Sequence, residues 1–259
     1  MSKQPDNHEP EEEQLAEGTL ISHLLELRSR LMKAVFAVLA VLLALTPFSR
    51  HVFEYVSEPL RSVVPDGRLI VTKVASPFLT PFKTTFFVAL FIAMPYVLFQ
   101  VWQFVAPGLY RREKRFAFPL IISSILLFYV GIAFAYFVVF RVMFTFFVKV
   151  LPGGVAMTPD IDAYLDFVLE MFLAFGLVFE VPIATLMLVW SGLVPLPTLA
   201  KIRPYVLLIA FVVGLFLAPD VFSQTLLAVP MYLLYEAGLL LARILLPEKT
   251  RVVEKEAET

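Results

Sequence analysis

The sequence contains no cysteine, so it can form neither a disulfide nor a thiolate site for a metal or a nucleophile. Charged residues are scarce: they make up 17% of the 259 residues, where an ordinary soluble domain has about 25%. The three histidines, His8, His23 and His51, are too scattered to draw a metal cluster, so we expect no metal or cofactor. There is also no glycine-rich phosphate loop and no serine–histidine–aspartate arrangement. Nothing in the sequence therefore indicates an enzyme.

Hydrophobic residues, by contrast, are abundant: they make up 59% of the chain, and the mean hydropathy is +0.83. They gather in runs of about 16–25 residues, which match the roughly 20 residues that a helix needs to cross a bilayer. Strands of a membrane barrel would instead be about 10 residues long with alternating polarity. We therefore predict an all-α membrane protein.

Segments with charges and prolines separate six apolar runs, which predict six transmembrane helices. The runs extend over Leu31–Phe48, Phe82–Val105, Phe116–Phe140, Phe167–Trp190, Tyr205–Ala218 and Val221–Ala242. Only Ala218-Pro219-Asp220 separates the last two, so we expect the fifth and sixth helices to form a short hairpin. Asp220 is well placed to cap the N-terminus of the sixth helix.

Six spans place both termini on one side of the membrane. Of the lysines and arginines, 14 fall on that side and 7 on the other, so the positive-inside rule puts both termini in the cytoplasm. We expect residues 20–243 to form the transmembrane domain. Residues 1–19 are expected to form an acidic, disordered cytoplasmic tail, and residues 244–259 a charged cytoplasmic tail.

Glu180 lies near the middle of the run Phe167–Trp190, where a carboxylate costs about 2.5–3.5 kcal/mol on insertion scales. Pro182 removes a backbone donor and frees the carbonyl of Val178, so a kink is predicted beside Glu180. Gln224, near the start of the sixth run, is a possible partner. Three interpretations remain open: an interhelical hydrogen bond of a protonated carboxyl, a proton relay, and a polar docking point for another helix.

Two carboxylates lie near the terminal side of the spans. Glu26 and Arg30 are spaced i,i+4, which predicts a surface ion pair on an interfacial helix. Glu113 is the lone carboxylate in the basic segment Arg111–Arg115, whose cations determine topology or contact lipid headgroups. Glu113 either neutralises them or accepts a guanidinium from a partner. Trp102 fits an aromatic belt at the membrane interface.

Several stretches of the chain resemble the TatC family, the receptor subunit of the twin-arginine protein translocase. They are His23–Leu31, Ser76–Phe78, Gln100–Tyr110 leading into Glu113, Phe134–Phe137, Ala174–Pro182, Arg203–Tyr205 and Asp220–Leu226. The resemblance extends over nearly the whole chain, from about Leu20 to Arg243. It implies a concave, glove-like bundle of six helices in the bacterial inner membrane, with short fifth and sixth helices.

The resemblance also implies a function, namely the binding of twin-arginine signal peptides of folded proteins at the cytoplasmic face. The expected partners are the single-span subunits TatA and TatB within an oligomeric receptor complex, together with membrane lipid; no nucleic acid is expected.

By the same resemblance, the residues expected to bind the signal peptide are Glu26, Arg28, Phe104 and Glu113. Glu180 and Gln224 match an intramembrane polar pair that contacts partner helices, and Pro59 and Asp220 match functional positions of the outside loops. One departure is visible. Relatives often have Thr-Pro-Pro-Asp before the sixth helix, whereas this chain has Ala218-Pro219-Asp220 and lacks that hydroxyl.

The competing hypothesis is a proton-coupled secondary transporter of a small solute, with Glu180 as the proton carrier. Many such transporters are built from inverted repeats. This sequence shows no internal repeat.

Overall fold

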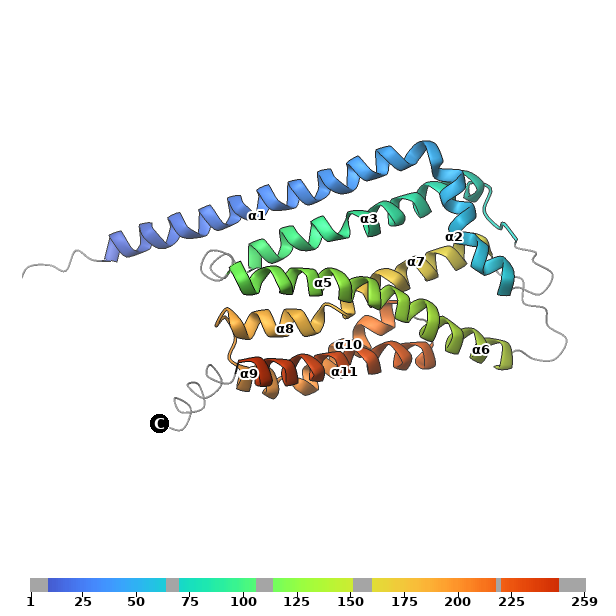
Figure 1. The fold of residues 1–259 in the computed structure, drawn as a ribbon. Helices are drawn as coiled ribbons and strands as arrows, with labels where there is room; N and C mark the ends of the chain where they lie inside the picture. The colour runs from blue at the N-terminus through green and yellow to red at the C-terminus, as the bar shows by residue number, and fades with distance from the viewer. Residues whose placement is uncertain (1–8, 64–69, 106–113, 151–159, 218–219, 247–259) are drawn as a thin grey trace, which may run out of the picture.

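The computed structural model describes residues 9–63, 70–105, 114–150, 160–217 and 220–246. These residues form helices joined by short connections, with one isolated bridge between Ile70 and Asp160 (Figure 1). The all-α prediction is therefore confirmed for the part of the chain that is described.

Five helical segments among these residues are long and apolar enough to cross a membrane: Ile21–Ser57, Ser76–Val105, Phe118–Phe147, Ile161–Trp190 and Val221–Leu245. The run expected as the fifth span forms a shorter apolar helix, Arg203–Phe216. A helix of this length rises about 22 Å, which is less than the roughly 30 Å of a hydrocarbon core.

The chain up to Val150 forms three long helical segments among the described residues. Helix α1 (Glu9–Leu45) continues through the turn η1 (Thr46–Phe48) into α2 (Ser49–Val63), and α1 packs along α3 (Ser76–Val105). Helix α5 (Lys114–Phe134) passes through a π-helical turn, η3 (Ala135–Val139), into α6 (Phe140–Val150).

The second half begins with α7 (Ile161–Val178) and α8 (Val181–Trp190), followed by α9 (Leu196–Lys201), α10 (Arg203–Leu217) and α11 (Val221–Leu245). In Figure 1, α1 lies along one side of the bundle, and α10 and α11 lie along the other. We call the end that holds the end of α3, the start of α5, α9 and the end of α11 the Glu26 end. The opposite end, with α2 and the starts of α3 and α7, is the Asp160 end.

Two predictions about the helices are wrong. Residues 9–19 were expected to be disordered, but their backbone is helical as part of α1. Most of them are good helix formers, the acidic ones favour a helix N-terminus, and extending an existing helix needs no new nucleus. The sixth helix is also not short: α11 has 25 residues, because the apolar run continues to Leu245 with Arg243 in its last turn. The short fifth helix, α10 with 15 residues, is confirmed.

The predicted kink at Pro182 is confirmed. Helix α7 ends at Val178, Phe179 and Glu180 form a turn, and α8 begins at Val181. Two backbone hydrogen bonds extend across the break: the Glu180 N–H donates to the Leu177 carbonyl (3.1 Å), and the Ala184 N–H donates to the Glu180 carbonyl (2.8 Å). These bonds reduce the number of unpaired backbone groups at a break inside a membrane-spanning segment.

Close packing between α5 and α7 fixes the position of this turn. At Gly131, a Cβ atom would lie 2.4 Å from the carbonyl oxygen of Phe175, and at Gly176 it would lie 2.5 Å from the ring of Phe128. Phe128 and Phe175 are fully buried. Glu180 follows Gly176 by about one helical turn, so this contact brings its side chain towards α5.

We predict that Gly131→Ala destabilises the protein by about 1–3 kcal/mol, because the added methyl group forces the backbones of α5 and α7 apart. Thermal unfolding of the purified protein in detergent measures this. The control is Ala133→Val, which adds methyl groups two residues further along α5 at an exposed position. Equal melting temperatures for Gly131→Ala and the control would contradict the prediction.

Candidate functional site

A buried chain of hydrogen bonds connects α3, α5 and the α7–α8 turn. The Trp102 Nε1–H donates to Ser124 Oγ (2.7 Å), and the Ser124 hydroxyl donates to Glu180 Oε2 (2.5 Å). Ser124 is completely buried, and Trp102 and Glu180 are 6% and 7% exposed. Since one hydroxyl both accepts and donates, Ser124 satisfies the indole and one carboxylate oxygen together.

Trp102 was predicted to lie in an interfacial aromatic belt, and that prediction is wrong. Its indole lies inside the bundle because Ser124 offers a partner for the one polar atom of the ring. Sequence spacing gives no indication of a contact between two residues on different helices.

Gln224, considered above as a possible partner of Glu180, forms no hydrogen bond with it in this structure. Gln224 Nε2 donates instead to the carbonyl oxygen of Phe211 on α10 (2.7 Å), the neighbouring helix of the α10–α11 hairpin. The second oxygen of Glu180, Oε1, is buried and has no hydrogen-bond partner among the described residues. A buried polar atom without a partner costs about 1–3 kcal/mol, so a polar group from outside the chain would stabilise it.

At the Glu26 end, the expected ion pair between Glu26 and Arg30 is present and is part of a larger network. Arg30 donates through Nε (2.9 Å) and Nη2 (2.6 Å) to Glu26 Oε1. Its third nitrogen, Nη1, donates to Gln103 Oε1 on α3 and lies 3.5 Å from Gln100 Oε1. The pair thus connects α1 to α3, and the Glu26 side chain remains 36% exposed.

Of the other residues expected to bind a signal peptide, the structure describes Phe104 and Arg28 but not Glu113. Phe104 lies next to Gln103 on α3, and its ring stacks on that of His23 on α1, with centroids 4.4 Å apart and an interplanar angle of 19°. His23 was not among the expected site residues. Arg28 is exposed. Glu113 lies outside the described residues, immediately before the first residue of α5, Lys114.

Of the two residues expected in the outside loops, the structure describes Asp220 in full and only the backbone of Pro59. Asp220 Oδ1 accepts the backbone N–H of Ser223 (2.8 Å), so its predicted role as the N-cap of α11 is confirmed. The backbone of Pro59 lies in α2, while its side chain is outside the described part of the structure. No group of three or more metal-ligating residues is found among the residues that are described.

The Asp160 end has a polar contact that the sequence analysis missed. Asp160 caps α7 through Oδ1, which accepts the N–H groups of Asp162 (2.9 Å) and Ala163 (3.1 Å). Its Oδ2 accepts the hydroxyl (2.5 Å) and the N–H (2.8 Å) of Thr72. These bonds, the Thr72 hydroxyl first, lower the pKa of the Asp160 carboxyl to about 2. The segment before α3 is thereby tied to α7.

Asp162 extends this contact to α3. Its carboxylate accepts hydrogen bonds from Lys73 (3.2 Å), Ser76 (3.2 Å) and Thr80 (3.0 Å). The hydrogen bond to Asp162 raises the pKa of Lys73. The partners lie more than 80 residues apart in the sequence, so no local spacing could have indicated them.

The chain is similar to known proteins over most of its length. Residues 22–230 match the family model described as Sec-independent protein translocase protein (TatC). TatC of Azotobacter chroococcum is 58% identical over 85% of this chain and 87% of its own length, and TatC of Escherichia coli K12 is 50% identical over 86% and 88%. A crystal structure of the twin-arginine translocase receptor TatC, 38% identical, covers 86% of this chain and 98% of its own with a TM-score of 0.77.

We predict that Ser124→Ala destabilises the protein by about 1–3 kcal/mol, because it leaves both the Trp102 indole and Glu180 Oε2 without partners. The matched control is Ser123→Ala on the same helix, which takes no part in this chain of hydrogen bonds. Thermal unfolding in detergent compares the two. A Ser124→Ala protein as stable as the Ser123→Ala protein would contradict the structural role of the hydroxyl.

Proposed function

The chain belongs to the TatC family, and from this premise we propose that its Glu26 end binds the paired arginines of twin-arginine signal peptides. As a TatC protein it is a non-enzymatic, multi-pass membrane subunit of the Sec-independent protein translocase. The relatives found are translocase proteins, so the alternative of a small-solute transporter is not supported.

One observation carries the proposal: a guanidinium is already held at the Glu26 end. Arg30 places all three of its nitrogens against oxygens of Glu26, Gln103 and Gln100. These oxygens are the kind of acceptors that an arginine of a peptide requires. An incoming arginine would share Glu26 with Arg30 or displace it, and the partial exposure of Glu26 supports such access.

We propose that Glu113 receives the second arginine. It precedes α5 directly, and α5 starts at the same end of the bundle as the Glu26 network (Figure 1). Two cations approaching a surface rich in lysine and arginine need local carboxylates to bind at all. The stacked rings of His23 and Phe104 would provide an aromatic surface beside this site. Arg28 is exposed and lies on the same helix as Glu26.

We further propose that the Glu26 end faces the cytoplasm, as the 14 lysines and arginines assigned to that side support. This orientation needs six crossings, so α10 would cross the membrane as the fifth span, in addition to the five longer segments. Its rise of about 22 Å would require a locally thinned bilayer or shelter beside α11. An uneven bundle of this kind supports the concave, glove-like shape that the family resemblance implies.

For Glu180 we propose a docking role for the helix of a single-span TatA or TatB subunit. The unpartnered Oε1 atom supports this, because a polar group on a partner helix would satisfy it. Gln224 would offer a second polar contact by exchanging its bond to the Phe211 carbonyl for a bond to the partner.

The peptide site is tested by Glu113→Gln and Glu26→Gln. We expect Glu113→Gln to abolish crosslinking to a twin-arginine signal peptide without affecting membrane insertion. Glu26→Gln should weaken peptide binding about tenfold or more, since charge-assisted hydrogen bonds are lost. Glu54→Gln, an exposed carboxylate on α2 at the other end, serves as the control. Normal crosslinking in Glu113→Gln would overturn the assignment.

The docking role is tested by Glu180→Ala. It should reduce copurification of the single-span subunits, and transport, more than it reduces signal-peptide binding. Glu170→Ala, an exposed carboxylate on α7, is the matched control. Loss of peptide binding with assembly intact would contradict the proposed role.

A further inference from the structure

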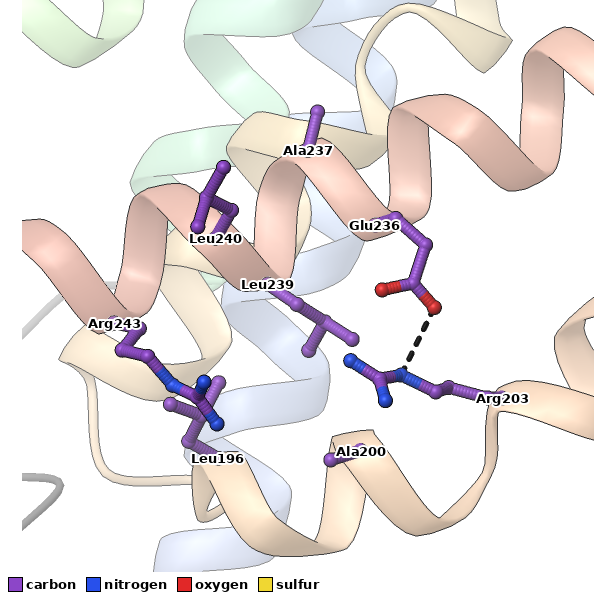
Figure 2. A pocket seen from close by; sticks show the side chains of 8 residues that line it. All are labelled: Leu196, Ala200, Arg203, Glu236, Ala237, Leu239, Leu240 and Arg243. Carbon is purple, nitrogen blue, oxygen red and sulfur yellow. Dashed lines mark ion pairs between the residues drawn. The ribbon is translucent and has the colours of Figure 1, made fainter.

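A cavity of about 290 Å³ lies at the Glu26 end, between α11, α9 and the start of α10. Figure 2 shows Arg203, Glu236 and Arg243 around it, with Leu239 between them on α11. The cavity contains none of the residues assigned above to signal-peptide binding or to partner docking. The role of this cavity is therefore a separate question.

The charged residues of the cavity leave an excess of positive charge. Arg203 Nε lies 2.9 Å from Glu236 Oε1 in an ion pair, and the same oxygen accepts a hydrogen bond from the Tyr232 hydroxyl (3.0 Å). Both terminal nitrogens of Arg203 are free of hydrogen bonds to other described residues, and Arg243 forms no ion pair within the described part of the chain. The cavity is therefore lined by two guanidinium groups and one carboxylate, and that carboxylate is already paired with Arg203.

The apolar side of the cavity continues towards the outer surface of the bundle. Leu239 is 5% exposed and forms an inner wall, whereas Leu240, which also lines the cavity, is 58% exposed. Leu233, seven residues earlier on α11 and therefore on the same helix face, is 60% exposed. In a membrane-spanning helix, exposed aliphatic side chains of this kind contact lipid tails.

From this combination we propose that the cavity binds the headgroup of an anionic phospholipid. The phosphate would lie between Arg203 and Arg243, since guanidinium groups bind phosphate with paired hydrogen bonds. The acyl chains would follow Leu240 and Leu233 along α11 towards the middle of the bilayer. Glu236 orients Arg203 by holding Nε, which leaves its terminal nitrogens for the ligand. Basic pockets between membrane helices are suited to lipids of this class. The proposal does not depend on signal-peptide binding.

The test measures binding of phosphatidylglycerol and of phosphatidylcholine to the purified full chain in detergent, by native mass spectrometry. We expect the unmodified protein to bind phosphatidylglycerol more tightly. Arg243→Gln should weaken this binding about tenfold through the loss of charge-assisted hydrogen bonds. Lys201→Gln is the matched control: it removes an exposed cation of α9 that does not line the cavity, so its effect should stay below about twofold.

A second variant tests the lipid assignment against a free phosphate. Leu240→Gln should weaken phosphatidylglycerol binding but leave the weaker binding of glycerol 3-phosphate unchanged. Equal binding of both lipids, or equal losses in Arg243→Gln and Lys201→Gln, would overturn the proposal. Glycerol 3-phosphate binding as tightly as the lipid would assign the cavity to a soluble anion. An acidic peptide that bound there in place of the lipid would assign it to a protein partner.

Discussion

The carboxylate of Glu180, removed from water inside a membrane-spanning segment, needs hydrogen-bond partners, and several features of the bundle meet that need. The turn at Phe179 and Glu180 places the side chain at a helix break. The close approach of α5 and α7 at Gly131 and Gly176 brings the carboxylate towards Ser124. The Ser124 hydroxyl donates a hydrogen bond to it. Trp102 completes the chain from α3. One oxygen of the carboxylate is thereby satisfied, and the other, Oε1, has no hydrogen-bond partner among the described residues.

Consecutive residues of α3 serve the two sites. Trp102 points into the bundle and belongs to the buried chain that ends on Glu180, whereas Gln103 holds Arg30 and Phe104 stacks on His23 at the Glu26 end. The surface proposed for signal peptides and the carboxylate proposed for partner helices are therefore connected through one helical turn. Under the two proposals, a peptide bound at the Glu26 end would act on the docking carboxylate through this helical turn.

The sequence indicated the features that depend on local pattern. The apolar runs, the kink before Pro182, the cap at Asp220 and the pair of Glu26 with Arg30 all follow from residues within a few positions of one another. The features that were misassigned or missed depend on contacts between different segments of the chain. Gln224 bonds to α10 rather than to Glu180, Trp102 is buried by Ser124, and Asp160 binds Thr72 across 88 positions. The pair of Arg203 with Glu236 belongs to the same class. A single sequence contains no periodicity that would reveal any of them.

The most direct test of the account is site-specific photocrosslinking from Phe104 and from Gln224 in the otherwise unmodified chain, in membranes that contain the single-span subunits and a twin-arginine precursor. The account predicts that the probe at position 104 crosslinks to the signal peptide near its paired arginines. It also predicts that the probe at position 224 crosslinks to the helix of a single-span subunit. If the paired arginines crosslinked to position 224 and not to position 104, the separation of the two sites would be contradicted.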